Sequence, residues 1–300
     1  MERIITLQVQ AEELPVTVGE LLRKRVNLSS RQISRLKFQK RGIFVNGMTA
    51  RVNQILQSAD EITICLEEPE KGSQHLIATP GHVDIRYEDE DLLVVNKSAG
   101  VPVHPSHGHY GDTLANHLVD YYRRLGKELL VRPVGRLDKD TSGLVLFAKN
   151  QVAAARLSAN KKALVQKEYL ALVNGCPKPL NGSVNLPIAP LKGTLNQMVT
   201  DQDGKAAVTH YEVIKEMKGC SLLRLWLEHG RTHQIRVHMA KIGHPLLGDE
   251  KYGTTGKLTR AALHCEKIRL LQPFSGEYVE VTAPIPEDME RIIENGTIEL

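Results

Sequence analysis

The sequence predicts an α+β fold in two parts: a mixed, largely antiparallel central sheet with flanking helices, preceded by a small α+β domain. Three observations support this prediction. Segments with strand patterns outnumber segments with helical patterns. Several strand segments follow one another directly, which favours antiparallel pairing over a doubly wound parallel sheet. The composition also changes near residue 68, where a polar segment begins.

Residues 1–68 form the predicted small domain. The segment "RIITLQVQ" alternates between apolar and polar residues, as a strand does. A helix is expected over "TVGELLRKRV", where Thr17 and Glu20 form a capping-box pattern. A second helix, "SSRQISRLKFQKRG", is expected to begin at Ser29 or Ser30 and to end at Gly42. The segment "IFVNGMTA" contains an Asn-Gly hairpin turn, and "DEITICLEE" is the closing strand.

Residues 69–82 are a predicted linker, because the segment around them is polar and contains Pro, Gly and Ser. Strands and helices then interleave over residues 83–300. The expected strands are "LLVVNK", "GLVLFAK", "KEYLALVNG", "SLLRLWLEHG", "AALHCEKIRLL" and "YVEVTAPIP". The expected helices are "TLANHLVDYYRRLG", beginning at Thr113, "NQVAAARLSANKK", and "THQIRVHMAKIG", with Thr232 as N-cap and Gly243 at its end.

Basic residues are concentrated near the N-terminus, although the whole chain has a formal charge of only +4. There is no acidic residue between Leu21 and Asn53. The basic residues of this stretch are Arg23, Lys24, Arg25, Arg31, Arg35, Lys37, Lys40, Arg41 and Arg51. A patch of one sign on a nearly neutral protein indicates a polyanionic partner. A solvated helix face is the alternative interpretation.

The composition bounds the class of protein. The 300 residues are 41% apolar and 25% charged, which is ordinary for a globular protein. The cysteines are scattered, at Cys65, Cys176, Cys220 and Cys265. We therefore expect a reducing cytoplasm, and neither a disulfide framework nor a zinc knuckle. The N-terminal segment is charged and alternating, unlike a signal peptide, and no apolar run reaches membrane length.

The stretch "RPVGRLDKDTSGLVLFAKN" contains two aspartates two residues apart. In an extended chain Arg136 and Asp138 point the same way. Asp140 begins the segment Asp-Thr-Ser-Gly, whose residue types favour a turn. Asp140 thus has a structural role, whereas Asp138 is a candidate for chemistry. An ordinary turn aspartate remains the alternative for Asp138.

Histidines cluster in "HGRTHQIRVHMAKIGH", but their pattern argues against a metal site. His229 and His233 have the spacing of zinc ligands on a helix, yet Gly230 lies between them and no HExxH glutamate is present. The segment "HPSHGH" lies in a Pro/Gly loop. Arg231 and Arg236 lie near the free N–H groups of the expected helix start, which suits a phosphate or carboxylate. A surface arginine pair is the alternative.

Four segments together resemble the successive motifs of the RluA-type RNA pseudouridine synthases: "YEDEDLLVVNKSAGVPVHPS", "GRLDKDTSGLVLFAKN", "KEYLALVNG" and "LEHGRTHQIRVHMAKIGHPLLGDEKYG". They occur in the family's order and cover nearly all of residues 83–285. The segment "SSRQISRLKFQKRGIFVNGMTARVNQIL" resembles the S-four-type RNA-binding domain, which often precedes this catalytic domain. The resemblance implies an RNA-binding patch made of Arg23, Lys24, Arg31, Arg35, Lys37, Lys40, Arg41 and Arg51.

The resemblance also implies a reaction. A uridine within RNA is isomerised: its base is detached from the ribose, turned and rejoined through carbon 5, with no cofactor or metal. The essential aspartate of the Arg-Leu-Asp motif maps to Asp138, which we expect in a central catalytic cleft. A carboxylate can act as nucleophile or as base. The atom that it attacks, or the proton that it removes, stays open.

Further roles are implied for residues near Asp138. Arg236 is expected to pair with Asp138 and to favour its ionised form. Tyr169 is expected to stack on the target base and to move a proton. Arg136 is expected to fill the space that the flipped base vacates. Ile235 is expected to line the pocket. The other expected substrate-binding residues are Arg231, Thr232 and Gln234.

Two positions depart from the family pattern: Gly135 stands where His is usual, and Ser98 where Pro is usual. Neither is the essential aspartate, so we expect an active enzyme. We also expect a monomer. Large-subunit ribosomal RNA is the expected substrate, with transfer RNA as the alternative. Two other classes stay open. One is a non-catalytic RNA-binding ribosome-assembly protein, and the other is a metal-dependent hydrolase that uses the histidines.

Overall fold

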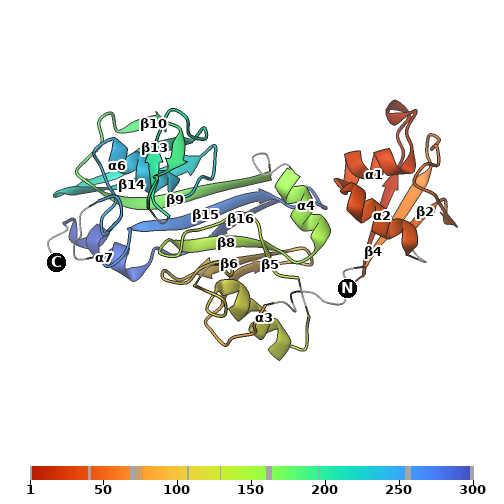
Figure 1. The fold of residues 1–300 in the computed structure, drawn as a ribbon, viewed down its shortest axis with the longest axis horizontal. Coiled ribbons are helices and arrows are strands. Elements are labelled where there is room, and N and C mark those ends of the chain that lie inside the picture. Colours follow the sequence, from red (N-terminus) through yellow and green to blue (C-terminus); the bar gives the residue numbers. More distant parts are fainter. Residues whose placement is uncertain are drawn as a thin grey trace.

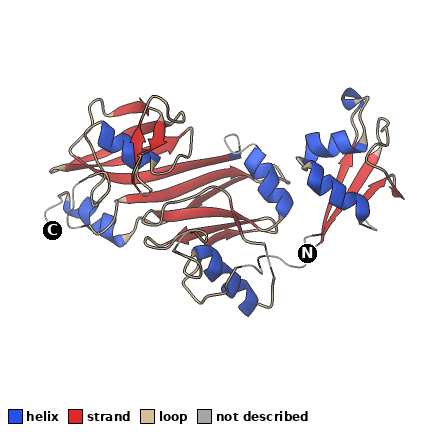
Figure 2. Cartoon of the chain, viewed as in Figure 1, coloured by secondary structure: helices blue, strands red, loops and turns tan. Residues whose placement is uncertain are grey.

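The computed structural model describes residues 2–39, 42–67, 73, 76–106, 108–128, 130–159, 164–194, 196–253 and 258–297. The chain builds a small four-stranded sheet near the N-terminus and a ten-stranded sheet from the remainder (Figure 1). A two-stranded ribbon accompanies the large sheet. Helices pack beside both sheets (Figure 2). None of the described helices is long and apolar enough to span a membrane.

The small sheet is antiparallel, with strand order β1-β4-β2-β3. Its elements are β1 (Glu2–Gln8), the 3-10 helix η1 (Ala11–Glu13), α1 (Val18–Val26), α2 (Ser30–Phe38), β2 (Ile43–Val45), β3 (Met48–Thr49) and β4 (Glu61–Glu67). Thr17 caps α1 and Ser29 caps α2, each in a capping box. The helix α2 ends at Phe38, before the expected Gly42. The Asn-Gly turn joins β2 to β3 as predicted.

The large sheet follows the order β10-β13-β14-β9-β15-β8-β6-β5, with β16 on β15 and β7 on β8. Its strands are β5 (Asp84–Glu88), β6 (Leu92–Lys97), β7 (Arg132–Pro133), β8 (Ser142–Ala148), β9 (Val165–Asn174), β10 (Asn181–Asn185), β13 (Val208–Met217), β14 (Cys220–Leu227), β15 (Leu263–Leu271) and β16 (Tyr278–Thr282). The ribbon is β11 (Ile188–Pro190) with β12 (Met198–Thr200). Among the described strands β8 and β15 pair in parallel and the other pairs are antiparallel, so the predicted fold class is confirmed.

The helices of this part are α3 (Leu114–Arg124), α4 (Gln151–Ala159), α6 (Gln234–Lys241) and α7 (Glu287–Asn295). Thr113 caps α3 as predicted. The helix α7 was not anticipated, although the sequence carries its signals. Pro286 precedes its first turn and Gly296 ends it in the left-handed region. Met289 and Ile292 are three residues apart and both are buried.

The parallel pairing of β8 with β15 lies near the middle of the large sheet. Ser142 pairs with His264 and Gly143 pairs with Cys265. Gly143 has φ +104°, and a Cβ there would lie 2.3 Å from the Cys265 carbonyl oxygen. Only glycine allows the two backbones to approach so closely. This contact fixes where the chain enters β8, and the loop before β8 carries Asp138.

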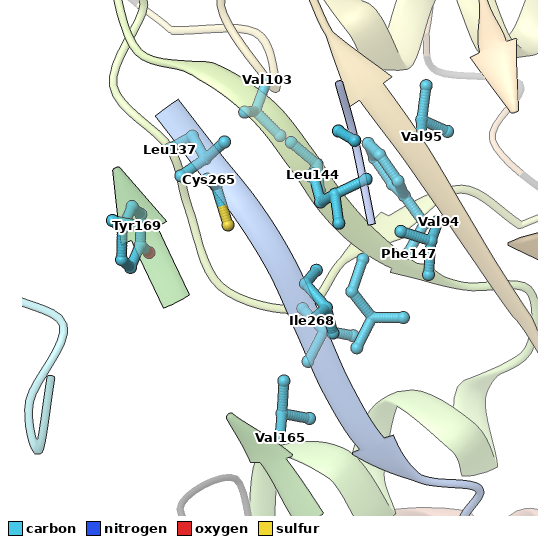
Figure 3. Packing of buried hydrophobic residues seen from close by; sticks show 14 of the residues in the cluster. Val94, Val95, Val103, Leu137, Leu144, Phe147, Val165, Tyr169, Cys265 and Ile268 are labelled. Atoms are coloured by element: carbon cyan, nitrogen blue, oxygen red, sulfur yellow. The ribbon is translucent and has the colours of Figure 1, made fainter. Parts of the chain in front are cut away.

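Aliphatic side chains from β6, β8 and β15 form the main core (Figure 3). Val94, Leu144 and Ile268 have no exposed surface. Tyr169 and Cys265 lie at one end of this cluster in Figure 3. The sheet that carries the site is therefore supported from within by close-packed apolar side chains.

Arg156 on α4 connects the two parts of the chain. Its guanidinium donates to the carbonyl oxygens of Val26 at 3.2 Å and Pro273 at 2.6 Å, and it lies 4.4 Å from the Phe274 ring centroid. Val152, also on α4, packs within the N-terminal core. The carbonyl of Val26 is at the C-terminal end of α1, where a cation is favourable.

Candidate active site

Asp138 begins a tight turn that leads into β8. The Thr141 N–H donates to the Asp138 carbonyl oxygen at 3.2 Å, and Lys139 and Asp140 are the turn residues. The expected turn over residues 140–143 is therefore wrong in its bounds. Residues 142 and 143 already belong to β8, because Gly143, with its positive φ, pairs closely with Cys265 of β15.

Lys97, at the end of β6, holds this turn through hydrogen bonds from its buried side chain. Its side chain is 1% exposed, and its Nζ donates to the carbonyl oxygens of Ser98 at 2.8 Å and Lys139 at 2.9 Å. Burial lowers the pKa of Lys97 to about 7, against the opposing effect of Asp140 and Asp138. The turn is thus attached to the buried end of a core strand.

A pocket that opens to solvent lies beside this turn. It is lined by Arg136, Leu137, Asp138, Thr141, Tyr169, Leu227, Gly230, Arg231, His233, Gln234, Ile235, Arg236 and Leu263. These residues come from the loop before β8, from β9, from the end of β14, from α6 and the loop before it, and from the start of β15. The pocket brings together seven of the eight predicted catalytic and substrate-binding residues. The eighth, Thr232, contacts Arg136 at its edge.

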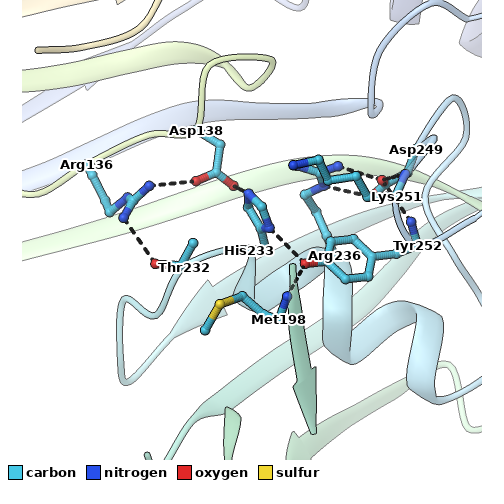
Figure 4. Close-up of polar contacts among 9 residues, drawn as sticks. All are labelled: Arg136, Asp138, Met198, Thr232, His233, Arg236, Asp249, Lys251 and Tyr252. Carbon is cyan, nitrogen blue, oxygen red and sulfur yellow. Dashed lines mark hydrogen bonds and ion pairs between the residues drawn. The ribbon is translucent and has the colours of Figure 1, made fainter. Parts of the chain in front are cut away.

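The Asp138 carboxylate has two polar neighbours in the pocket (Figure 4). Arg136 Nη2 lies 3.6 Å from Oδ1, and His233 Nε2 lies 3.9 Å from Oδ2. Arg136 also donates from Nη1 to the Thr232 hydroxyl at 3.0 Å. Arg136 and Asp138 thus lie on the same side of the chain, as their spacing predicts. The side chain of Asp138 is 15% exposed and that of Arg136 is 60% exposed.

Arg236 does not form the predicted ion pair with Asp138. Its Nε and Nη2 donate to the two carboxylate oxygens of Asp249, at 2.7 and 2.6 Å (Figure 4). Asp249 has no exposed surface and also accepts from the backbone N–H groups of Lys251 and Tyr252. A buried guanidinium takes the partner with matching fork geometry. Arg236 still lines the pocket and adds positive charge near Asp138.

The start of α6 also differs from the prediction. The N-cap is His233 rather than Thr232, and its φ of 54° is left-handed. Gln234 stabilises this irregular start, because its side chain donates to the Val208 carbonyl and accepts from the Arg231 N–H. Gln234 is therefore engaged in local structure as well as lining the pocket.

Tyr169, on β9, forms part of the pocket wall and is 7% exposed. Burial, followed by the nearby Cys265 and Asp138, raises the pKa of Tyr169 well above its ordinary value. Its phenol stays protonated at neutral pH. It can therefore donate a proton or a hydrogen bond, and its ring offers a flat apolar surface.

Sequence reasoning did not assign roles to four residues of the site: Lys97, His233, Asp249 and Tyr252. All lie within the segments that carry the motifs. The sequence spacing presents His233 only as a candidate metal ligand. The described residues contain no group of three His, Cys, Asp or Glu side chains placed to hold a metal ion.

The predicted RNA-binding residues lie apart from this pocket, on the small sheet's helices and loops. Arg23 and Lys24 are on α1, Arg31, Arg35 and Lys37 are on α2, and Arg51 follows β3. All six are exposed. Lys40 and Arg41 lie outside the described residues. Phe38, at the end of α2, is 80% exposed beside Lys37.

An aspartate, a buried tyrosine and cationic side chains surround one pocket on a mixed sheet. This set suits an enzyme that uses a carboxylate as nucleophile or base. Comparison with known proteins identifies the class. A profile for RNA pseudouridylate synthases matches residues 91–241. The chain belongs to the RNA pseudouridine synthase family and is an isomerase that acts on RNA.

Individual relatives agree with this assignment. The chain is 43% identical to the RNA pseudouridine synthase YlyB of Bacillus subtilis over 84% of this chain and 85% of that protein. It is also 43% identical to ribosomal large subunit pseudouridine synthase D of Zymomonas mobilis, over 69% and 71% of the two chains. The structure of human RNA pseudouridylate synthase domain containing 1 superposes with a TM-score of 0.57, at 26% identity, over 72% of this chain and 96% of that one.

Proposed function

We propose that this enzyme isomerises uridines in large-subunit ribosomal RNA, with Asp138 as the essential carboxylate. The proposed substrate is supported by two relatives named ribosomal large subunit pseudouridine synthase D, from Zymomonas mobilis and Escherichia coli, at 43% and 41% identity. The proposed chemistry is supported by one observation above all. Asp138 lies in the same pocket as Tyr169, Ile235 and Arg236, and Arg136 lies at its exposed edge.

The pocket suits a single flipped-out uridine. A base that leaves its stack needs a flat apolar surface and a group to replace it. Tyr169 supplies the surface, and Ile235, 4% exposed, supplies an apolar wall. Arg136 is the exposed cation at the rim, so its guanidinium can enter the space that the base vacates.

Asp138 then acts on the uridine as nucleophile or as base. Both roles use the ionised carboxylate, and the guanidinium of Arg136 lies 3.6 Å from its Oδ1. The protonated Tyr169 can donate a hydrogen bond to a carbonyl oxygen of the detached base. Arg236, fixed by Asp249, adds positive charge where the negative charge of the detached uracil develops. The base is rejoined to the ribose through carbon 5, the proton on that carbon is released, and N1, which has lost its bond to the ribose, takes up a proton.

The rest of the chain positions the RNA. We assign residues 1–68 to an S-four-type RNA-binding domain, residues 69–82 to a linker and residues 83–300 to the catalytic domain. Exposed cations of α1 and α2 support the first assignment, since they suit the phosphate backbone. Within the described part of the chain no disulfide joins the cysteines, which supports a reducing cytoplasm. We expect a monomer.

Mapping pseudouridines tests the proposal. RNA from a strain that lacks the gene is compared with RNA from its parent by carbodiimide treatment and reverse transcription. The proposal expects at least one large-subunit site to be lost. A lost site in transfer RNA alone would contradict the substrate, and no lost site would favour a binding-only role in ribosome assembly.

A further inference from the structure

His233 lies between Asp138 and Tyr252 and contacts both with its two ring nitrogens (Figure 4). Nε2 is 3.9 Å from the Asp138 Oδ2, and Nδ1 is 2.8 Å from the Tyr252 hydroxyl. The ring is 9% exposed and packs edge-to-face on Tyr252, with centroids 5.6 Å apart. The imidazole is therefore held in one place with one nitrogen facing the essential carboxylate.

The hydrogen bonds at Tyr252 favour one tautomer of His233. The Met198 N–H donates to the Tyr252 hydroxyl oxygen at 2.8 Å. The hydroxyl proton is then free to be donated to His233 Nδ1, so Nδ1 accepts and Nε2 bears the hydrogen. Burial lowers the pKa of His233, although Asp138 opposes this effect. A neutral ring that accepts at Nδ1 and donates at Nε2 is consistent with these contacts.

The backbone also places His233 for this contact. Its φ of 54° is left-handed, which is uncommon for a residue other than glycine and is often found at functional sites. Tyr252 is itself held, because its N–H donates to Asp249 and Arg236 lies 5.3 Å from its ring centroid. Arg236 and Asp249 thus support the ring of Tyr252, which in turn fixes His233.

We propose that His233 is a positioning residue for Asp138: its Nε2–H donates to Oδ2 and leaves Oδ1 directed at the substrate. The inference rests on the proposed role of Asp138. The distance of 3.9 Å is longer than a hydrogen bond, and catalytic contacts often shorten only when substrate is bound. Arg136, which lies near Oδ1, is then released from Asp138 to enter the RNA.

Two substitutions at His233 separate a donor from a space-filling group. His233→Leu removes the N–H, whereas the carboxamide of His233→Gln can present one near the position of Nε2. The loss of a hydrogen bond to a charged group corresponds to a roughly 10- to 100-fold fall in kcat. We expect that fall for His233→Leu with KM for RNA within about twofold, partial recovery for His233→Gln, and a smaller fall for Tyr252→Phe.

The assay measures tritium released from large-subunit ribosomal RNA transcribed with uridine tritiated at carbon 5. His238 provides the matched control, because it lies on the same helix, is fully buried and contacts Thr209 and Leu186. His238→Gln should lower the melting temperature and leave kcat of the folded enzyme unchanged. A wild-type kcat in His233→Leu, or a raised KM with unchanged kcat, would overturn the inference. No tritium release by the wild-type enzyme would overturn the proposed function and this inference with it.

Nitrogen NMR gives a second readout that needs no turnover. In protein with ¹⁵N-labelled histidine, the ring shifts of His233 should show a neutral ring protonated at Nε2 at neutral pH. Tyr252→Phe should change the Nδ1 shift, because that nitrogen loses its donor. A ring protonated at Nδ1 would contradict the proposed geometry.

Discussion

Arg236 and Asp249 form a bidentate buried pair, with donor–acceptor distances of 2.7 and 2.6 Å. Neither side chain is more than 5% exposed. The pair fixes the guanidinium at the pocket wall while its charge still acts on Asp138. The arginine of the motif thus depends on a second aspartate, 13 residues later, for its position.

Asp249→Leu should therefore be strongly destabilising, because it leaves a buried cation without its partner. We expect a loss of about 3–5 kcal/mol in the free energy of unfolding, measured by urea denaturation. The control is the double variant Arg236→Met with Asp249→Leu, which should be more stable than Asp249→Leu alone. Equal stabilities of the single and double variants would contradict a coupled pair.

Asp138→Asn should abolish pseudouridine formation while RNA binding and the melting temperature stay close to those of the wild type. The substitution keeps the size of the side chain and removes the ionised carboxylate that both chemical routes need. Asp140→Asn, two residues away in the same turn, is the matched control and should retain most activity. Turnover by Asp138→Asn would remove the essential role from Asp138.

Gly143→Ala should destabilise the fold more than an alanine at another left-handed glycine. A Cβ at Gly143 would lie 2.3 to 2.8 Å from the Cys265 backbone, whereas Gly276, with φ +73°, has nothing within 4 Å. Gly276→Ala should cost only the local conformational penalty, about 1–2 kcal/mol. Thermal unfolding of both variants measures the difference. Equal losses of stability would mean that the β8 and β15 backbones can move apart to accommodate the added Cβ.

Arg31→Gln and Arg35→Gln should each weaken RNA binding and reduce its salt dependence. Both side chains are exposed on α2. If each contacts one phosphate, the slope of log K against log salt falls by about 0.7–0.9 per substitution. Arg291, exposed on α7 beside Glu287, is the control. Filter binding at several salt concentrations checks this, and an unchanged slope would place the RNA elsewhere.

Much of the fold followed from local sequence patterns. The capping boxes at Thr17, Ser29 and Thr113 mark three helix starts, because they involve residues only three apart. The Asn-Gly turn identified the β2–β3 hairpin for the same reason. The helix α7 was missed although its capping and apolar spacing are visible in the sequence. The strand order of the large sheet could not be read locally, since it depends on pairing between distant segments.

The sequence by itself determined the family, the two-part organisation of its patterns and the identity of the candidate residues in the pocket, because these depend on residue types in a fixed order. Only the tertiary structure decided which of them touch. In the structure Arg236 pairs with Asp249, His233 lies beside Asp138, and the turn begins at Asp138. Such pairings depend on side-chain reach and burial across segments up to about a hundred residues apart, and these are properties of packing rather than of local pattern.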